Sequence, residues 1–323
     1  MSDNLNTTVN GTQPLSCSGN PPAEKIGKTF AYCLIFVVSL AGNTVIGIIV
    51  YKTKTMRKPI NFFIVNMAMS DLLFPIFFIP REIQLLYIDS WLIDGPLGQA
   101  LCKLTAFLTD VSAAVSIQSL ILIAVSRFGA VVYSLRYPLI SSKLCPFFIL
   151  VTWIVALACF SPYFFGYKLA EYHGRLICRM LWEEAFGEYS SFQSYFLSVL
   201  MALVFIPLVV IAILYIIIFL KLKSQRSPGE QSTNAGQRQQ RERNVLNMSI
   251  AIVLGFAVCW LPLAIGWLVF FFASDIRWCS FHYFTIVARF MAHANCAINP
   301  CICFIFTRNY RKGLKTLLRF NYF

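Results

Sequence analysis

The sequence predicts an all-α membrane protein, a seven-transmembrane helix bundle with a short cytoplasmic eighth helix and a β-hairpin in the second outer loop. Hydrophobic residues make up 58% of the chain and charged residues only 13%, and so few charges could not cover the surface of a soluble domain. Apolar stretches long enough for the roughly 20 helical residues that cross a bilayer recur along the chain. They lack the period-two alternation of a transmembrane β-barrel, which favours helices.

The apolar stretches divide the chain into three parts. We expect the seven spans near residues 29–51, 61–87, 99–132, 145–166, 192–221, 245–272 and 280–305. The parts are an N-terminal tail at 1–28, a seven-transmembrane domain at 29–306, and an eighth helix with a short cytoplasmic tail at 307–323. A stretch rich in Ser, Gln, Gly and Arg at about 222–243 is predicted to be a cytoplasmic loop.

Basic residues set the expected orientation. They gather in the first, third and fifth connections and after the last span, for example Lys52, Arg136, Lys221 and Arg308. The positive-inside rule therefore predicts an extracellular N-terminus and a cytoplasmic C-terminus for this multi-pass protein, which we expect in the plasma membrane. The net charge of +13 follows from that topology and indicates contact with anionic lipid, not with nucleic acid. Sequons at Asn6 and Asn10 in the outer tail predict glycosylation.

Several polar residues lie deep in apolar spans. Asp71 must face the bundle interior and find partners, because an ionisable group is costly in lipid. Ser116, Asn295 and Asn299 can supply oxygen atoms from neighbouring helices. The Asn-Pro pair ending at Pro300 breaks the last span, which is tolerated where the backbone faces protein or water.

An ordered set of motifs covers the chain from about residue 29 to 318. The motifs are Gly42-Asn43, Asn66-Met-Ala-Met-Ser-Asp71, Ser126-Arg127-Phe128, Trp153, Pro207, Tyr215, Phe256, Cys259-Trp260-Leu-Pro262, Asn299-Pro300-Cys-Ile-Cys303 and Tyr310. Together, in this order and in these spans, they resemble the class A (rhodopsin-like) G-protein-coupled receptors.

The resemblance implies an ion site and a disulfide. In the family, the cluster at Asp71, Ser116, Asn295 and Asn299 holds an allosteric sodium ion; a purely structural hydrogen-bond network is the alternative. The family pattern also pairs Cys102 with Cys178, which would fix the second outer loop over the bundle. Cys17 and Cys279, both expected outside, either form a second bridge or do not pair with each other.

The resemblance also implies an activation switch with two departures from the family. The switch residues are Ser126, Arg127, Tyr215, Glu242, Phe256, Trp260, Pro262, Asn299, Pro300 and Cys303. Ser126 replaces the usual acidic neighbour of Arg127, and an exposed serine cannot replace that charge pair. Cys303 replaces the tyrosine of the NPxxY motif. The departures predict raised basal activity, and the alternative is drift with little effect.

The residues at the bundle mouth favour a peptide ligand. Thr109 stands where aminergic receptors carry an aspartate, and Asp110 is rotated from it by the roughly 100° that separates successive helix residues. His293 stands where opsins need a lysine. The ligand-binding residues expected here are Arg81, Glu82, Thr109, Asp110, Trp260, Arg289 and His293. An internal Glu82–Arg289 bridge that merely closes the bundle is the alternative for that pair.

The second outer loop, roughly 167–191, reads as two extended runs around a turn at His173-Gly174. This loop resembles the hairpin lid of the tachykinin, neuropeptide Y and RFamide groups of neuropeptide receptors. The resemblance implies an extracellular peptide ligand, a heterotrimeric G protein that binds after outward movement of the sixth helix, and arrestin as a further partner. Alternatives are a class A receptor for an amine or lipid, or a constitutively active orphan. No enzyme activity and no cofactor other than sodium are expected.

Overall fold

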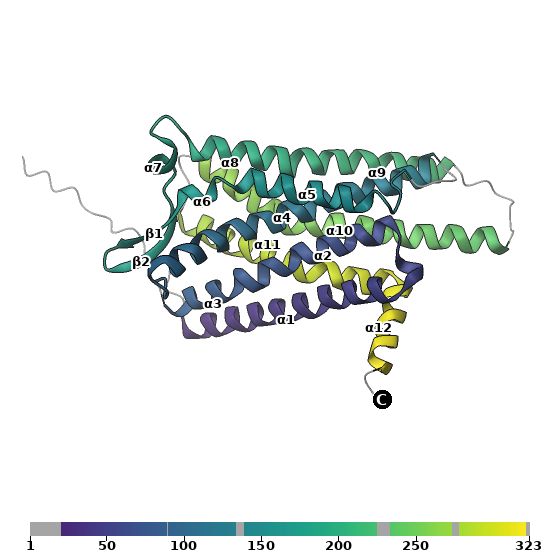
Figure 1. Ribbon diagram of the computed structural model, residues 1–323, viewed down its shortest axis with the longest axis horizontal. Helices are drawn as coiled ribbons and strands as arrows, with labels where there is room; N and C mark the ends of the chain where they lie inside the picture. Colours follow the sequence, from purple (N-terminus) through teal and green to yellow (C-terminus); the bar gives the residue numbers. More distant parts are fainter. Residues whose placement is uncertain (1–20, 89, 134–138, 225–232, 273–277, 321–323) are drawn as a thin grey trace, which may run out of the picture.

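The computed structural model describes residues 21–88, 90–133, 139–224, 233–272 and 278–320, without the side chains of 233–242, 278–280 and 319–320. The described residues form a bundle of long helices that run side by side (Figure 1). A two-stranded hairpin lies at one end, here the hairpin end, and a short helix turns aside at the other, here the α12 end.

The helices follow the expected spans closely. The helical elements are α1 (Pro22–Lys52), η1 (Lys54–Met56), α2 (Pro59–Phe77), α3 (Ile79–Tyr87), α4 (Gly95–Val132), α5 (Cys145–Phe160), α6 (Tyr163–Gly166), α7 (Trp182–Phe186), α8 (Phe192–Leu200), η2 (Met201–Phe205), α9 (Ile206–Ser224), α10 (Thr233–Phe272), α11 (Trp278–Phe306) and α12 (Arg308–Phe320).

In the described part of the chain, six helical segments are long and apolar enough to cross a membrane, and a seventh is counted if α11 and α12 are taken as one bent span. The polar residues that α11 carries, among them Arg289, His293 and Asn299, lower its hydropathy. Because α11 packs between α1, α2 and α10, His293 and Asn299 are buried against protein, and Arg289 lines the cavity described below.

Two spans are broken where the sequence offers a physical reason. The second span divides into α2 and α3 at Phe78, between Pro75 and Pro80, and prolines remove backbone donors from a helix. The fifth span contains one π-helical turn, η2, which ends two residues before Pro207. Such single π turns are the usual form of π-helix in proteins.

Two expected boundaries differ in the structure. The helix α1 begins at Pro22, within the expected tail at 1–28, because proline fits the first turn of a helix. The loop expected at about 222–243 is shorter, since α9 continues to Ser224 and α10 begins at Thr233. Gln, Arg and Glu dominate the start of α10 and are good helix formers.

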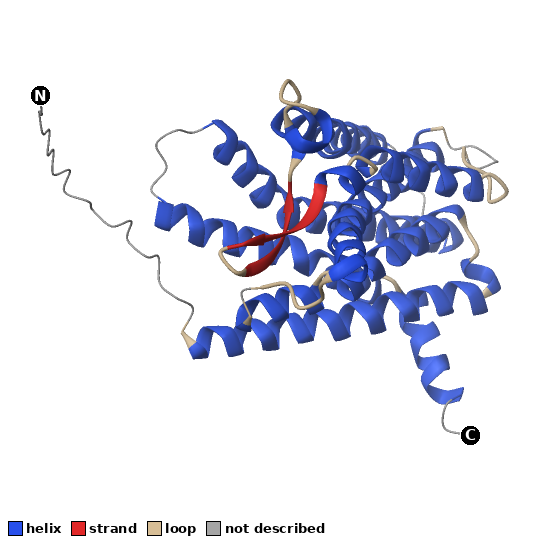
Figure 2. Ribbon diagram, turned by 60° about the vertical axis from the view of Figure 1, so that its left-hand side comes forward, coloured by secondary structure: helices blue, strands red, loops and turns tan. Residues whose placement is uncertain are grey.

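The hairpin forms where the sequence predicts it. Strands β1 (Tyr167–Tyr172) and β2 (Arg175–Met180) pair antiparallel, with Tyr167 opposite Met180. His173 and Gly174 both have positive φ, 50° and 72°, as a tight two-residue hairpin turn requires. Figure 2 shows the hairpin crossing the end of the bundle.

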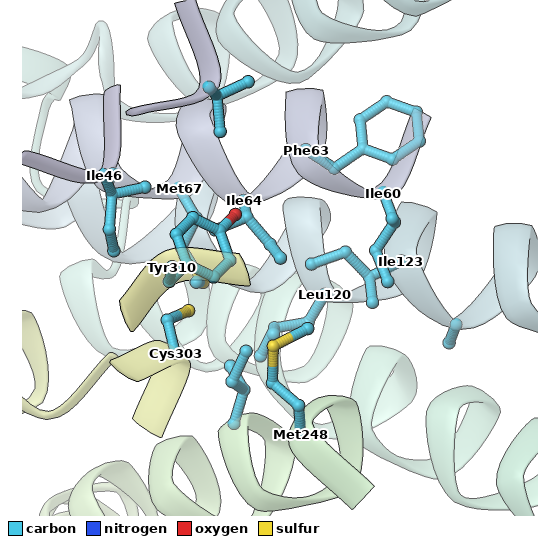
Figure 3. Packing of buried hydrophobic residues seen from close by; sticks show 14 of the residues in the cluster. Ile46, Ile60, Phe63, Ile64, Met67, Leu120, Ile123, Met248, Cys303 and Tyr310 are labelled. Carbon is cyan, nitrogen blue, oxygen red and sulfur yellow. The ribbon is translucent and has the colours of Figure 1, made fainter. Parts of the chain in front are cut away.

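The core is apolar and gathers between α1, α2, α4, α10 and α11, toward the α12 end. Figure 3 shows Tyr310 and Cys303 beside Ile46 and Met67 in this cluster. The helix α12 bends by 98° from α11. The bend is held by Tyr310, which is fully buried and donates a hydrogen bond of 3.2 Å to Asn61 Oδ1.

Candidate ligand cavity and signalling network

A cavity of about 490 Å³ opens at the hairpin end of the bundle, within the 300 to 1,000 Å³ typical of ligand pockets. Its walls come from α2, α3, α4, α5, α6, α8, η2, α10, α11 and the hairpin. All the side chains expected to contact a ligand line this cavity, namely Arg81, Glu82, Thr109, Asp110, Trp260, Arg289 and His293. The structure thus brings together residues from four helices, α3, α4, α10 and α11, that the sequence could only propose one by one.

The Asp110 carboxylate lies in the wall between α4 and the hairpin. Its Oδ2 accepts a hydrogen bond of 2.8 Å from the Tyr163 hydroxyl of α6. The step of about 100° from Thr109 does not turn Asp110 away, because both residues line the cavity. Thr109 itself donates to the Thr105 carbonyl of its own helix. Sequence reasoning missed Tyr163, which lies 53 residues away and in no recognised motif.

On α3, Glu82 pairs with its neighbour Arg81 and not with Arg289. Arg81 Nη1 lies 3.6 Å from Glu82 Oε1, and the Arg81 guanidinium lies 5.4 Å from the centre of the Trp91 ring. Among the described residues, Arg289 forms no ion pair within 4.0 Å with Glu82. The internal Glu82–Arg289 bridge is therefore absent from this conformation, and Arg289 remains exposed at the cavity rim.

His293 closes one side of the cavity floor. Its Nδ1 lies 3.2 Å from the Tyr32 hydroxyl of α1, and its ring packs edge-on against Phe78 and tilted against Phe74. On α10, Trp260 also lines the cavity and stacks on Phe256 at 5.9 Å between ring centres. Trp260 is thereby positioned between the cavity and the buried core below it.

The hairpin is fixed to the bundle at several points. The expected disulfide joins Cys102 of α4 to Cys178 of β2, with the Cα atoms 5.6 Å apart. Gln99 accepts a hydrogen bond from the Leu169 amide and donates one to the Tyr167 carbonyl. Burial and the nearby Asp110 carboxylate raise the pKa of the Tyr167 phenol, so this hydroxyl stays protonated at neutral pH.

A polar network surrounds Asp71 in the middle of the bundle. Ser116 donates to Asp71 Oδ1 at 2.6 Å, and the Asn299 amide donates to Asp71 Oδ2 at 2.8 Å. Ser39 also donates to the Asp71 carbonyl. Asn295 is buried nearby on α11 but makes no hydrogen bond to Asp71 in the described structure. The network links α1, α2, α4 and α11.

The donor set around Asp71 suits a sodium ion. The amide oxygens of Asn43, Asn295 and Asn299 are buried and accept no hydrogen bond within the part of the chain that is described. Buried oxygens without a donor are costly, and a hard cation prefers such oxygen ligands. Two of the ligands implied by the family pattern, Asn295 and Asn299, therefore have a free oxygen to offer.

Asn66 is a second polar junction, whose role the sequence indicated only as part of a motif. Its amide donates to Ser119 at 2.9 Å and to Thr152 at 3.2 Å, and its oxygen accepts from Trp153 Nε1 at 2.9 Å. One buried side chain of α2 thus holds both α4 and α5. The motif residue Trp153 supplied the signal that could have revealed this contact.

The α12 end contains the expected switch residues on α4, α9 and α11. Ser126 is buried, with an exposed fraction of 9%, and not exposed as expected, because α4 runs through the centre of the bundle. The Tyr215 hydroxyl is buried and forms no hydrogen bond within the part of the chain that the structure describes. Cys303 is fully buried beside Tyr310, in the apolar cluster.

Five predicted residues lie outside the described part of the structure. These are the expected glycosylation sites Asn6 and Asn10, the cysteines Cys17 and Cys279, of which only the backbone of the second is described, and Glu242, whose side chain is not described. The predictions made for them therefore stay predictions.

Comparisons with known proteins agree with this architecture. A family model described as "7 transmembrane receptor (rhodopsin family)" matches residues 42–302. The RYamide receptor of Drosophila melanogaster is 31% identical over 304 residues, which cover 91% of this chain and 63% of that receptor. The chain thus spans less than two thirds of that relative's length.

Two further relatives match over more of their own length. The QRFP-like peptide receptor of Branchiostoma floridae is 31% identical over 309 residues, covering 93% of this chain and 79% of that receptor. The neuropeptide Y receptor type 1 of Xenopus laevis is 30% identical over 328 residues, covering 98% and 87%.

Proposed function

The chain belongs to the rhodopsin family of seven-transmembrane receptors, and on that premise we propose that it is a neuropeptide receptor that signals to a cytoplasmic heterotrimeric G protein. The family consists of receptors and not of enzymes. The relatives named above are receptors for RYamide, a QRFP-like peptide and neuropeptide Y. We place the hairpin end outside the cell at the plasma membrane, in line with the basic residues at the α12 end.

One observation carries the peptide proposal. The cavity wall is mostly apolar, but five charged side chains also line it: the carboxylates Glu82 and Asp110 and the guanidinium groups Arg81, Arg179 and Arg289. A lipid would leave most of these charged groups without partners, and a simple amine would need the carboxylate at the Thr109 position. A peptide can offer a cation to Glu82 or Asp110 and an acceptor to Arg289.

The proposed mechanism is a shift of population between two conformers. A ligand in the cavity favours an active conformer only as far as it binds that conformer more tightly. Trp260 touches the cavity and stacks on Phe256, so ligand contact there can bias the position of α10. Outward movement of α10 would release Arg127 from Glu242 and open a cleft at the α12 end for the G protein. The lysines at the end of α9, Lys221 and Lys223, border that cleft.

We also propose that sodium is an allosteric ligand of the Asp71 network. The carboxylate and the Ser116 hydroxyl would hold it with Asn295 and Asn299, whose amide oxygens lack donors in the described structure. The ion supplies a positive charge that compensates the Asp71 carboxylate in a site away from water. A conformer that rearranges α11 against α2 would hold sodium less well.

The first test is G-protein activation in cultured cells that express the full chain. Cells are exposed to a pooled library of amidated neuropeptides, and the unliganded signal is recorded against untransfected cells. Activation by a peptide that is absent from untransfected cells supports the proposal. Activation only by amines or lipids, supplied in parallel pools, contradicts the peptide class while leaving a receptor. A high signal without any ligand supports the constitutively active alternative.

A further inference from the structure

The two carboxylates that line the described cavity, Glu82 and Asp110, differ in their surroundings. The charge of Glu82 is compensated, because Arg81 lies 3.6 Å away and is itself held over the Trp91 ring. Asp110 takes part in none of the ion pairs found among the described residues. Of the two, Asp110 is therefore the carboxylate that lacks a cation.

The surroundings of Asp110 are aromatic and rigid. Tyr163, which donates to Asp110 Oδ2, is only 1% exposed, and its ring lies 5.1 Å from that of Tyr167. Tyr163 and Tyr167 both line the cavity beside Asp110. The nearby Tyr195 hydroxyl donates to the Cys159 carbonyl instead. One carboxylate oxygen thus has a fixed donor, and no described side chain donates to the other.

A carboxylate with tyrosine rings beside it has the chemistry that binds organic cations. The carboxylate supplies a charge-assisted hydrogen bond, and ring faces attract a guanidinium or ammonium group through their quadrupole. Both contributions are stronger in a cavity that is partly shielded from water than at an exposed surface.

We propose that Asp110 and the ring of Tyr167 form a cation subsite that takes the guanidinium or ammonium group of the ligand, with the Asp110 carboxylate positioned by Tyr163, while Glu82 positions Arg81. This inference deepens the proposed function and rests on it for the statement that the natural ligand is a peptide. The subsite lies on the α4 and hairpin side of the cavity, whereas Arg289 and Glu82 lie on the α3 and α11 side. A ligand would therefore be oriented with its cation toward the hairpin.

A thermal-shift measurement on the purified full chain tests the subsite without any knowledge of the ligand. The probes are N-acetyl-L-argininamide, N-acetyl-L-lysinamide and the uncharged N-acetyl-L-citrullinamide, each near 10 mM. Ligand that binds only the folded state raises the melting temperature, by roughly 2 °C at several times its Kd. We expect this rise with the cationic probes and none with the citrulline probe. The larger of the two cationic responses identifies guanidinium or ammonium as the preferred group.

Two matched variants assign the shift to one carboxylate. Asp110→Asn keeps the shape and the contact with Tyr163 but removes the charge, and should abolish the shift. Glu82→Gln makes the same chemical change across the cavity and should retain it. If Asp110→Asn does not fold, Tyr167→Leu on the hairpin removes one ring wall and should lower the shift. Equal shifts with all three probes, or a shift that survives Asp110→Asn and is lost in Glu82→Gln, overturns the subsite.

A cell assay separates the failure of this inference from the failure of the proposed function. Any activating peptide from the library is resynthesised with each arginine replaced by citrulline and each lysine by acetyl-lysine. Neutralising the peptide residue that occupies the subsite should lower the potency of the peptide at least tenfold on the unaltered receptor. The same peptide change should have little further effect on the Asp110→Asn receptor. An equal loss in both receptors refutes the subsite and leaves the peptide receptor. A specific thermal shift without activation by any peptide refutes the peptide class and leaves the subsite.

Discussion

Gly42 of α1 lies directly against Pro300 of α11, so closely that a β-carbon on Gly42 would be 2.6 Å from Pro300 Cβ. Real β-carbons do not approach that closely, so the two helices can pack here only because residue 42 has no side chain. The contact lies between the first span and the proline inside the last one, next to the Asp71 network.

The Gly42 contact predicts a sharp difference between two glycines of one helix. Gly42→Ala should push α1 from α11 and cost about 1–3 kcal/mol of stability. Gly47→Ala is the control, because nothing lies within 4 Å of a β-carbon there, and alanine is favoured over glycine in a helix by about 1 kcal/mol. Melting temperatures of the purified variants in detergent check this. Equal melting temperatures for both would contradict the close contact.

The Asp71 network predicts stabilisation by sodium. Replacing choline chloride by sodium chloride at constant ionic strength should raise the melting temperature, and at ten times Kd the gain is about 1.4 kcal/mol. Asp71→Asn removes the charge that holds the ion and should abolish the rise. Glu82→Gln, a carboxylate change outside the network, should keep it. If sodium does not change the melting temperature of the unaltered chain, the residues around Asp71 form a purely structural hydrogen-bond network and not an ion site.

Asn66 predicts a large loss of stability from one buried amide. Asn66→Ala leaves Trp153 Nε1 without its acceptor and removes the donor to the Ser119 and Thr152 hydroxyls, which should cost about 2 kcal/mol. Met69→Ala serves as control on the same helix, since Met69 is 56% exposed and is expected to face lipid. The comparison is made by thermal unfolding. If Asn66→Ala and Met69→Ala have the same melting temperature, the hydrogen bonds of Asn66 do not stabilise the bundle.

Ser126 predicts a change of basal signalling. Ser126→Asp places a carboxylate beside Arg127, and a hydrogen bond to a charged group of about 1.5–3 kcal/mol would favour the resting conformer by tenfold or more. The unliganded G-protein signal, normalised to surface expression, should therefore fall. Ser126→Asn introduces a side chain of the same size as aspartate but without the charge, and it should leave the unliganded signal unchanged. If the unliganded signal does not fall in Ser126→Asp, the serine at this position has little effect on basal activity.

Much of the fold was predictable because a membrane helix can be recognised from a local run of about 20 apolar residues. The spans, the turn at His173-Gly174 and the Cys102–Cys178 bridge follow from runs of apolar residues, turn chemistry and a family pattern. The start of α10 at Thr233 was not predictable in the same way, because its polar residues suit both a loop and a solvated helix.

The sequence predicted which residues line the cavity, but not which of their side chains contact one another. Helical spacing and the family pattern identified the residues that line the cavity, including Asp110. Spacing alone suggested that Asp110 points away from Thr109, but α4 is surrounded by other elements, so more than one of its faces lines the cavity. The partners Tyr163 of Asp110 and Arg81 of Glu82 depend on three-dimensional packing and on rotamers, which no periodicity encodes.

The attachment of the hairpin has a kinetic consequence. Its strands are held by Gln99, by the bridge to Cys102 and by the Trp91 amide, which donates to the Leu176 carbonyl. A lid fastened from both strands does not need to lift, so a ligand would enter the cavity beside it. Docking to a preformed opening of this kind proceeds without a slow rearrangement step. Differences among ligands would then appear chiefly in how long each one stays bound.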